Sequence, residues 1–280
     1  KVNGPVYSLG QKNLPVTLVV HSDPDQGLLG SWGGLIVVNA QTESILRYTR
    51  VVGAVGSRLP ERQDSYGLTG CITFYKSDVL IEDSVFDDLQ CEDALNIISS
   101  NFTIRRLEVI GANADAFDSD YSTGTVTNSS FSNIANDGID ISGSEVEVKS
   151  SQFVDIGDKA ISVGERSNLN ASGLTIDRSV AGVVSKDKSV AHIYDSNFGS
   201  ISGSALMAYT KKEEYGPAEI HCTNCVFDNV ESVAAKQFES RITIDGKQIS
   251  TKPFSRSQLQ VAGYVSSDKF AEKGYSSVQY

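Results

Sequence analysis

The feature that most constrains the fold is a repeat of about 22 residues in the middle of the chain. Successive copies of the repeat, which we call lines, begin at Ile72, Leu95, Phe117, Ile139, Ile161, Val183 and Leu206. The four steps from Leu95 to Val183 are 22 residues each, and the two outer steps are 23. An apolar residue opens every line, and Ala or Gly stands immediately before every line after the first. A fixed period of this kind indicates stacked copies of one structural unit.

The pattern within each line favours strands over helices. Apolar and polar residues alternate with a period of two, and the chain contains 24 Gly but only 1 Met. The period is too short for a propeller blade or an ankyrin repeat, and the consensus of a leucine-rich repeat is absent. We therefore predict an all-β fold, a single parallel β-helix solenoid in which coils stack about 4.8 Å apart. Like residues of successive lines, such as Phe131 and Phe153, then stack inside.

One domain is expected over residues 1–280. Residues 1–70 are predicted to form irregular N-terminal coils, with a turn at Trp32–Gly34 and a long loop near Arg58–Tyr66. Regular coils are predicted over residues 72–205 and the last coils over 206–248, with a charged loop at Lys211–Pro217. Residues 249–280 would form a tail that caps the open end. Because the repeat fades at both ends, the sequence also fits a piece of a larger chain.

Charge and composition exclude several functional classes. The formal net charge of -11 argues against a nucleic-acid-binding protein, which needs a basic surface. Hydrophobic residues make up 40% of the chain, so a core can form, yet no apolar run of about 18 residues could span a membrane. The four cysteines are Cys71, Cys91, Cys222 and Cys225. They could be core thiols, disulfides of an exported protein or, least favoured, a zinc site at Cys222 and Cys225.

Through these stacked lines, from about Gly34 to Ile244, the sequence resembles the right-handed parallel β-helix superfamily of pectin-lyase-like proteins. The resemblance and the crossover rule imply a right-handed solenoid. Members of the superfamily include polysaccharide lyases, inverting glycoside hydrolases, uronate epimerases and non-catalytic adhesins. The resemblance thus implies an extended polysaccharide as partner and a secreted, periplasmic or cell-surface location.

The repeat also aligns carboxylates into columns. Asn96, Asp118 and Asp140 occupy the second position of their lines, and Asp120 occupies the fourth. Both positions should point away from the core, because the first and third positions are apolar. Carboxylates stacked about 5 Å apart repel by roughly 1–3 kcal/mol, so a cation, separated pKa values or nearby lysines should offset the repulsion. A further column precedes the small corner residue and holds Asp93, Asp115, Asp137 and then Lys159. The alternation of apolar and polar residues does not show whether the side chains of this column point inward or outward.

Among lyases of the superfamily, calcium binds the uronate carboxylate and a base removes the C5 proton. By this resemblance the metal is Ca²⁺, and its expected ligands are Asn96, Asp118, Asp120 and Asp140. The expected catalytic residues are Lys159, Lys186, Asp118 and Asp140, with either lysine as the base. The expected substrate-binding residues are Asp115, Asp137, Arg166 and Tyr209, and the Tyr209 hydroxyl could donate to the leaving oxygen.

Three other functions stay open. An inverting glycoside hydrolase could use Asp118, Asp120 and Asp140 as acid and bases, although the His and the Arg-x-Lys motif of polygalacturonase-like enzymes are missing. An epimerase is less favoured, because the Asp-Pro-His motif of mannuronan epimerases is absent. A non-catalytic surface module could bind glycan on Tyr75, Tyr121 and Tyr209. The corner aspartates could instead only cap backbone N–H groups.

Overall fold

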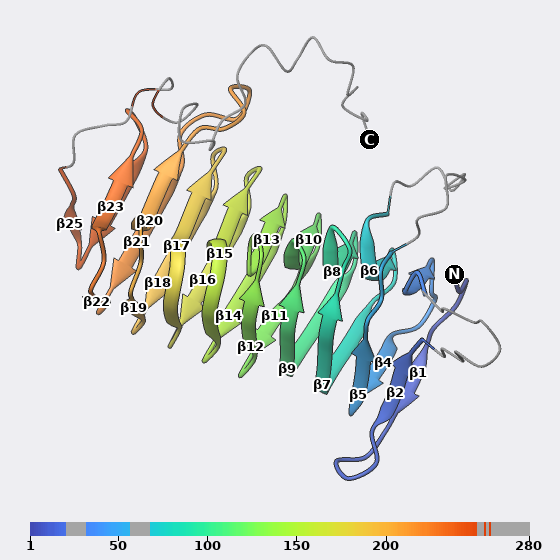
Figure 1. Ribbon diagram of the computed structural model, residues 1–280. Helices are drawn as coiled ribbons and strands as arrows, with labels where there is room; N and C mark the ends of the chain where they lie inside the picture. The colour runs from blue at the N-terminus through green and yellow to red at the C-terminus, as the bar shows by residue number, and fades with distance from the viewer. Residues whose placement is uncertain (21–31, 57–67, 251–254, 256–257, 259–280) are drawn as a thin grey trace.

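The chain folds into a β-solenoid whose coils follow one another along a single axis (Figure 1). The computed structural model describes residues 1–20, 32–56, 68–250, 255 and 258. The predicted loop near Arg58–Tyr66 and nearly all of the predicted cap lie outside these residues. No helix in the described residues is long and apolar enough to cross a membrane.

Three ladders of parallel strands run along the solenoid, and each strand pairs with the equivalent strand of the coils before and after it. The first ladder comprises β3 (Leu35–Val38), β6 (Gly70–Tyr75), β8 (Asp93–Ile98), β10 (Asp115–Asp120), β13 (Ile139–Ser142), the C-terminal parts of β15 (Gln152–Gly164) and β17 (Thr175–Lys186), β20 (Ser204–Tyr209) and β23 (Ser232–Lys236).

The second ladder comprises β1 (Tyr7–Leu9), β4 (Ser44–Arg47), the N-terminal parts of β7 (Val79–Leu89) and β9 (Asn101–Ala112), β11 (Thr123–Thr127), β14 (Glu145–Lys149), β16 (Asn168–Ser172), β18 (Val190–Tyr194), β21 (Glu219–Thr223) and β24 (Arg241–Ile244). A short antiparallel strand, β25 (Lys247–Gln248), pairs with β24. The third ladder comprises β2 (Val16–Val19), β5 (Thr49–Val52), β12 (Ser130–Ile134), β19 (Asn197–Gly199), β22 (Val226–Asp228) and the remaining parts of β7, β9, β15 and β17.

The register of the first ladder is the one that the repeat predicts. Phe117 of β10 pairs with Ile139 of β13, and Ile139 pairs with Ile161 of β15. All three side chains are fully buried, and the rings of Phe131 and Phe153 stack 5.0 Å apart in the third ladder. Stacking these apolar columns buries a surface that one coil alone would expose, so the core is continuous along the axis. The predicted all-β parallel solenoid is confirmed.

A column of buried serines supports the corner between the first and second ladders, and the sequence reasoning missed it. Its members are Ser77, Ser100, Ser122, Ser144, Ser167 and Ser189. The backbone N–H of each of the first five donates to the hydroxyl of the next serine, at 2.8–3.1 Å. These hydroxyls thus satisfy backbone donors that the bend leaves without a strand partner. The spacing of 22 or 23 residues is visible in the sequence and could have predicted the column.

Ser144→Ala is expected to lower the free energy of unfolding by about 1–3 kcal/mol, because a buried N–H loses its acceptor. The Ser144 hydroxyl accepts from Ser122 N at 2.9 Å and donates to Ser119 O, also at 2.9 Å. Urea unfolding followed by circular dichroism would measure the change. Ser132→Ala, on the outer face of β12, is the control and should change stability little; equal stability of the two variants would contradict the role given to the column.

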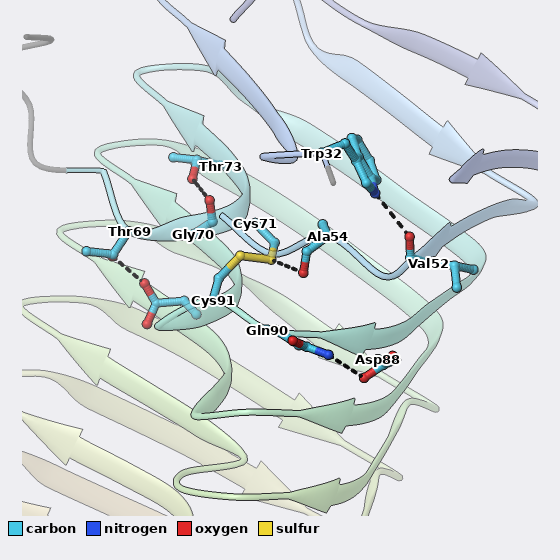
Figure 2. Close-up of a disulfide and its surroundings, with 11 residues drawn as sticks. Trp32, Val52, Ala54, Thr69, Gly70, Cys71, Thr73, Asp88, Gln90 and Cys91 are labelled. Atoms are coloured by element: carbon cyan, nitrogen blue, oxygen red, sulfur yellow. Dashed lines mark hydrogen bonds between the residues drawn. A yellow bond between two sulfur atoms is a disulfide. The ribbon is translucent and has the colours of Figure 1, made fainter. Parts of the chain in front are cut away.

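Both cysteine pairs form disulfides. Cys71 at the start of β6 is bonded to Cys91, just before β8, with Cα atoms 5.5 Å apart (Figure 2). Cys222 in β21 is bonded to Cys225 three residues later. All four cysteines are therefore disulfide-bonded, and the zinc alternative for Cys222 and Cys225 is wrong. Figure 2 also places Thr69 beside the first disulfide; its hydroxyl donates to Asp93 at 2.6 Å, at the edge of the first ladder's outer face.

Candidate functional site

The outer face of the first ladder carries the aligned carboxylates. Asp118 pairs in register with Asn96 of the coil before and Asp140 of the coil after. Phe117 and Ser119 point into the core and are fully buried, whereas Asp118 and Asp120 are only partly buried on the outside. The Asn96 amide donates to Asp118 across the coil boundary at 3.3 Å. The predicted alternation therefore holds in these strands.

The corner carboxylates turn toward the same outer face. Asp115, Asp137 and Asp140 each present one oxygen within 4.8 Å of the other two. Asp115 also accepts from the Asn136 amide at 2.5 Å and from Asp137 N at 2.9 Å. Three carboxylates from the corner and strand columns thus meet at one point.

A pocket of about 220 Å³ opens beside this point, and we call it the lysine–aspartate pocket. It is lined by Asn136, Asp137, Asp140, Asp158, Lys159, Lys186, Tyr209 and Lys211. Tyr209 is only 1% exposed, and burial raises the pKa of its hydroxyl, so it stays protonated. The pocket therefore combines anionic, cationic and neutral donor groups.

Two of the lysines neutralise the carboxylates. Lys159 Nζ lies 3.2 Å from Asp137 Oδ1 and also binds Asp158. Burial alone would lower the pKa of Lys159, but the charges of Asp137 and Asp158 outweigh burial and raise the pKa to about 12. Lys186 Nζ lies 3.6 Å from Asp140 Oδ2, and the charge of Asp140 likewise overcomes burial and raises the pKa of Lys186. In this arrangement both amines are cations.

Lys211 differs from the other two lysines. It stands just beyond β20, where its backbone N–H donates to Asp187 Oδ1 at 2.7 Å. Its side chain is exposed, and the positive charge of Lys186 lowers the pKa of its amine. Of the lysines that line the pocket, Lys211 is therefore the one best suited to accept a proton.

Crowding and burial raise the pKa values of the aspartates. Burial raises the pKa of Asp118 well above its ordinary value, and the charge of Asp120 adds to the shift. Burial also raises the pKa of Asp120 to about 6 and those of Asp93 and Asp137 to about 7. A bound cation would favour the ionised forms of nearby carboxylates and so reverse these shifts.

The residues at this face fit a divalent cation. Asp140 Oδ1 is buried and has no hydrogen-bond partner among the residues that the structure describes, although Asp140 belongs to the group of three converging carboxylates. Ser162 Oγ, next to Asp140 in the ladder, and Asn96 Oδ1 are also buried without a partner. Calcium takes six to eight hard oxygen ligands of this kind. The fit rests on the unsatisfied oxygens together with the convergence of the three aspartates.

The structure brings some predicted site residues together and separates others. Asp115, Asp137, Asp140, Lys159, Lys186 and Tyr209 gather at the lysine–aspartate pocket or its edge. Of the four predicted metal ligands, only Asp140 belongs to the converging carboxylate group found in the described residues. Arg166 is exposed and lies over the Tyr215 ring, 5.3 Å from its centroid, outside the lysine–aspartate pocket.

Asn136, Asp158 and Lys211 were missed as site residues. Asn136 and Asp158 each precede a residue of the corner column, Asp137 and Lys159 respectively. This position next to the column could have predicted them as site residues. Lys211 opens a loop that departs from the repeat, so the alignment of lines could not place it.

Residues 64–198 match the family model described as "Right handed beta helix region". The fold of the chain is a right-handed parallel β-helix. No curated protein sequence matches this β-helix. Among solved structures, a pectate lyase from Paenibacillus sp. 0602 superimposes with a TM-score of 0.50 at 10% identity, over 95% of this chain and 86% of that chain. The catalytic domain of a GH87 α-1,3-glucanase in complex with nigerose gives a TM-score of 0.47 at 12% identity, over 87% of this chain and 61% of that one. At these identities the likeness is one of fold.

Asp118→Asn is expected to stabilise the calcium-free β-helix at pH 8 by about 1–3 kcal/mol, because it removes a buried charge that Asp120 also repels. Because the pKa of Asp118 is raised in the folded protein, folding favours its protonated form. The contribution of Asp118 to the free energy of unfolding is therefore largest below the pKa that Asp118 has in the unfolded chain. This contribution is lost as the pH rises through the pKa that Asp118 has in the folded protein. The gain should vanish near pH 4. Thermal unfolding of both proteins at the two pH values in EDTA would measure it, and a loss of stability at pH 8 would contradict the electrostatic account.

Proposed function

We propose that the protein is a calcium-assisted lyase of an acidic polysaccharide, acting at the lysine–aspartate pocket. The observation that carries the proposal is the meeting of three carboxylates within 4.8 Å beside a pocket lined by three lysines. The net charge of -11 would repel a polyanion from most of the surface. Lys159, Lys186 and Lys211 supply the local positive charge that such a substrate needs.

Asp115, Asp137 and Asp140 would hold the calcium ion. When bound, the ion supplies a positive charge that neutralises the uronate carboxylate and makes the C5 proton more acidic. Lys159 and Lys186 hold Asp137 and Asp140 in place and add positive charge at the site.

We assign the base to Lys211 and not to the predicted Lys159 or Lys186, whose amines are already protonated. The Lys211 amine takes the C5 proton, and the electron pair of the C–H bond forms the C4–C5 double bond. The bond from C4 to the glycosidic oxygen breaks, and the Tyr209 hydroxyl donates a proton to the departing oxygen. The raised pKa of Tyr209 keeps its hydroxyl protonated, so the proton is present for the departing oxygen.

An inverting glycoside hydrolase is the second candidate, and the pKa values of the aspartates favour it. Asp120 has a pKa of about 6 and Asp118 a raised one, so one could act as acid while another ionised carboxylate activates water. This chemistry needs no metal, and its rate would fall as the acid ionises above neutral pH.

We also propose a secreted, periplasmic or cell-surface location and an extended polysaccharide as partner. Two disulfides support this location, because such bonds persist in oxidising compartments. A long ladder face gives room for several sugar units of a chain.

The test is a panel of polyuronides and neutral glycans, incubated with calcium or with EDTA. The lyase proposal predicts a calcium-dependent rise in the ultraviolet absorbance of unsaturated products from a polyuronide. New reducing ends without that absorbance would establish hydrolysis instead. Binding without either product would establish the non-catalytic module, and each of these two results would overturn the lyase proposal.

A further inference from the structure

A second pocket, of about 770 Å³, lies at the C-terminal ends of β6, β8, β10 and β13. We call it the tyrosine pocket, because Tyr75, Tyr121 and Tyr215 line it together with Lys76, Lys212 and Asp120. Tyr75 and Asp120 are the last residues of β6 and β10, so this pocket lies where the strands of the first ladder end. Its volume is within the range of small-molecule sites.

Tyr121 presents its ring to solvent in this pocket. The residue is 54% exposed, so its ring is accessible to a ligand in the pocket. Gly143 occupies the equivalent position one coil on, and the Tyr121 N–H donates to Ser142 O at 2.8 Å. A Cβ atom at Gly143 would lie only 2.7 Å from Tyr121 Cδ1. The absence of a side chain at Gly143 therefore leaves the space in which the Tyr121 ring lies.

The charges around the tyrosine pocket differ from those of the lysine–aspartate pocket. Lys212 is already paired with Glu165. Lys76 lies 5.3 Å from the centroid of the Tyr75 ring and makes no ion pair within the described part of the chain. An exposed aromatic ring next to an ammonium group that has no ion pair among the described residues suits a ligand with an apolar ring face and a carboxylate.

One loop contributes to both pockets. Asp187 Oδ1 accepts from the backbone of Lys211 at 2.7 Å and of Lys212 at 2.6 Å. Lys211 lines the lysine–aspartate pocket, and Lys212 and Tyr215 line the tyrosine pocket. Asp187 thus fixes the part of the loop that separates the two pockets.

We propose that the tyrosine pocket binds a further sugar unit of the acidic polysaccharide, with the sugar ring against Tyr121 and the uronate carboxylate toward Lys76. The assignment of an acidic polymer rests on the proposed function. The tyrosine pocket is a binding subsite that takes no part in bond cleavage, so it should matter for long chains and not for short ones.

The test measures binding of hexagalacturonate and digalacturonate by calorimetry with calcium, in a Lys211→Met background in which turnover is expected to be slow. Tyr121→Ala should weaken hexagalacturonate binding by about tenfold and leave digalacturonate binding unchanged. Lys76→Met should weaken hexagalacturonate binding but not maltohexaose binding. Tyr194→Ala, which removes a 43% exposed tyrosine from the second ladder, is the matched control and should have no effect.

The outcomes separate this inference from the proposed function. If the wild type cleaves polygalacturonate but Tyr121→Ala binds hexagalacturonate as tightly as its parent, the subsite is wrong and the lyase stands. If only maltohexaose binds, and binding depends on Tyr121, the acidic ligand and the lyase are both overturned. If neither hexasaccharide binds, the subsite is wrong, and the panel of polyuronides decides the lyase separately. Unchanged thermal unfolding midpoints would exclude misfolding of the variants.

Discussion

Asp140→Asn is expected to weaken calcium binding by at least about a hundredfold and to remove turnover of a polyuronide with it. Asp140 contributes one of the three converging carboxylates, and its Oδ1 has no other partner. The neutral amide keeps the shape of the side chain but removes the charge that a cation needs. Isothermal titration with calcium measures the affinity, and the calcium-dependent rise in unfolding temperature gives a second readout.

Asp228→Asn is the matched control, because it removes the same charge from β22 in the third ladder. It should leave calcium affinity and turnover unchanged. Equal affinity of wild type and Asp140→Asn would show that calcium binds elsewhere or not at all, and the proposed ligand set would be wrong.

Lys211→Met is expected to lower turnover by about 10²–10⁴-fold with little change in KM, as for loss of a general base. Lys211→Arg should not restore activity, because a guanidinium stays protonated. In the wild type, turnover should rise with pH as the Lys211 amine loses its proton, and its lowered pKa moves that rise to lower pH than for an ordinary lysine. Initial rates across a pH series measure both effects.

Lys188→Met removes an exposed lysine from a nearby turn and should retain wild-type rates. If Lys211→Met retains the rate and the pH profile while Lys159→Met loses them, the base is Lys159, one of the two lysines that the family resemblance suggested.

The spacing of the lines was enough to predict the fold and the stacking of side chains. Once Phe117 and Ile139 were aligned, Asp118 had to lie beside Asp140, because parallel pairing in register keeps equivalent residues adjacent. The same spacing contained the serine column, whose role became clear only from the hydrogen bonds between Ser122 and Ser144.

The details of the site depended on bends and loops, which the repeat does not describe. Asp115 and Asp137 precede a corner, and the turn of the backbone there decides that they face Asp140. Lys211 belongs to a loop that Asp187 holds in place, so its position follows from hydrogen bonds outside the strand pattern. The roles of the lysines could not be ranked either, since their pKa values depend on which carboxylates each amine contacts.

The convergence of Asp115, Asp137 and Asp140 into a calcium site is tested most directly by anomalous diffraction from crystals grown with calcium. The account predicts an anomalous peak bonded to oxygens of all three side chains. Crystals that lack a peak there, with Lys159 and Lys186 still against Asp137 and Asp140, would contradict it.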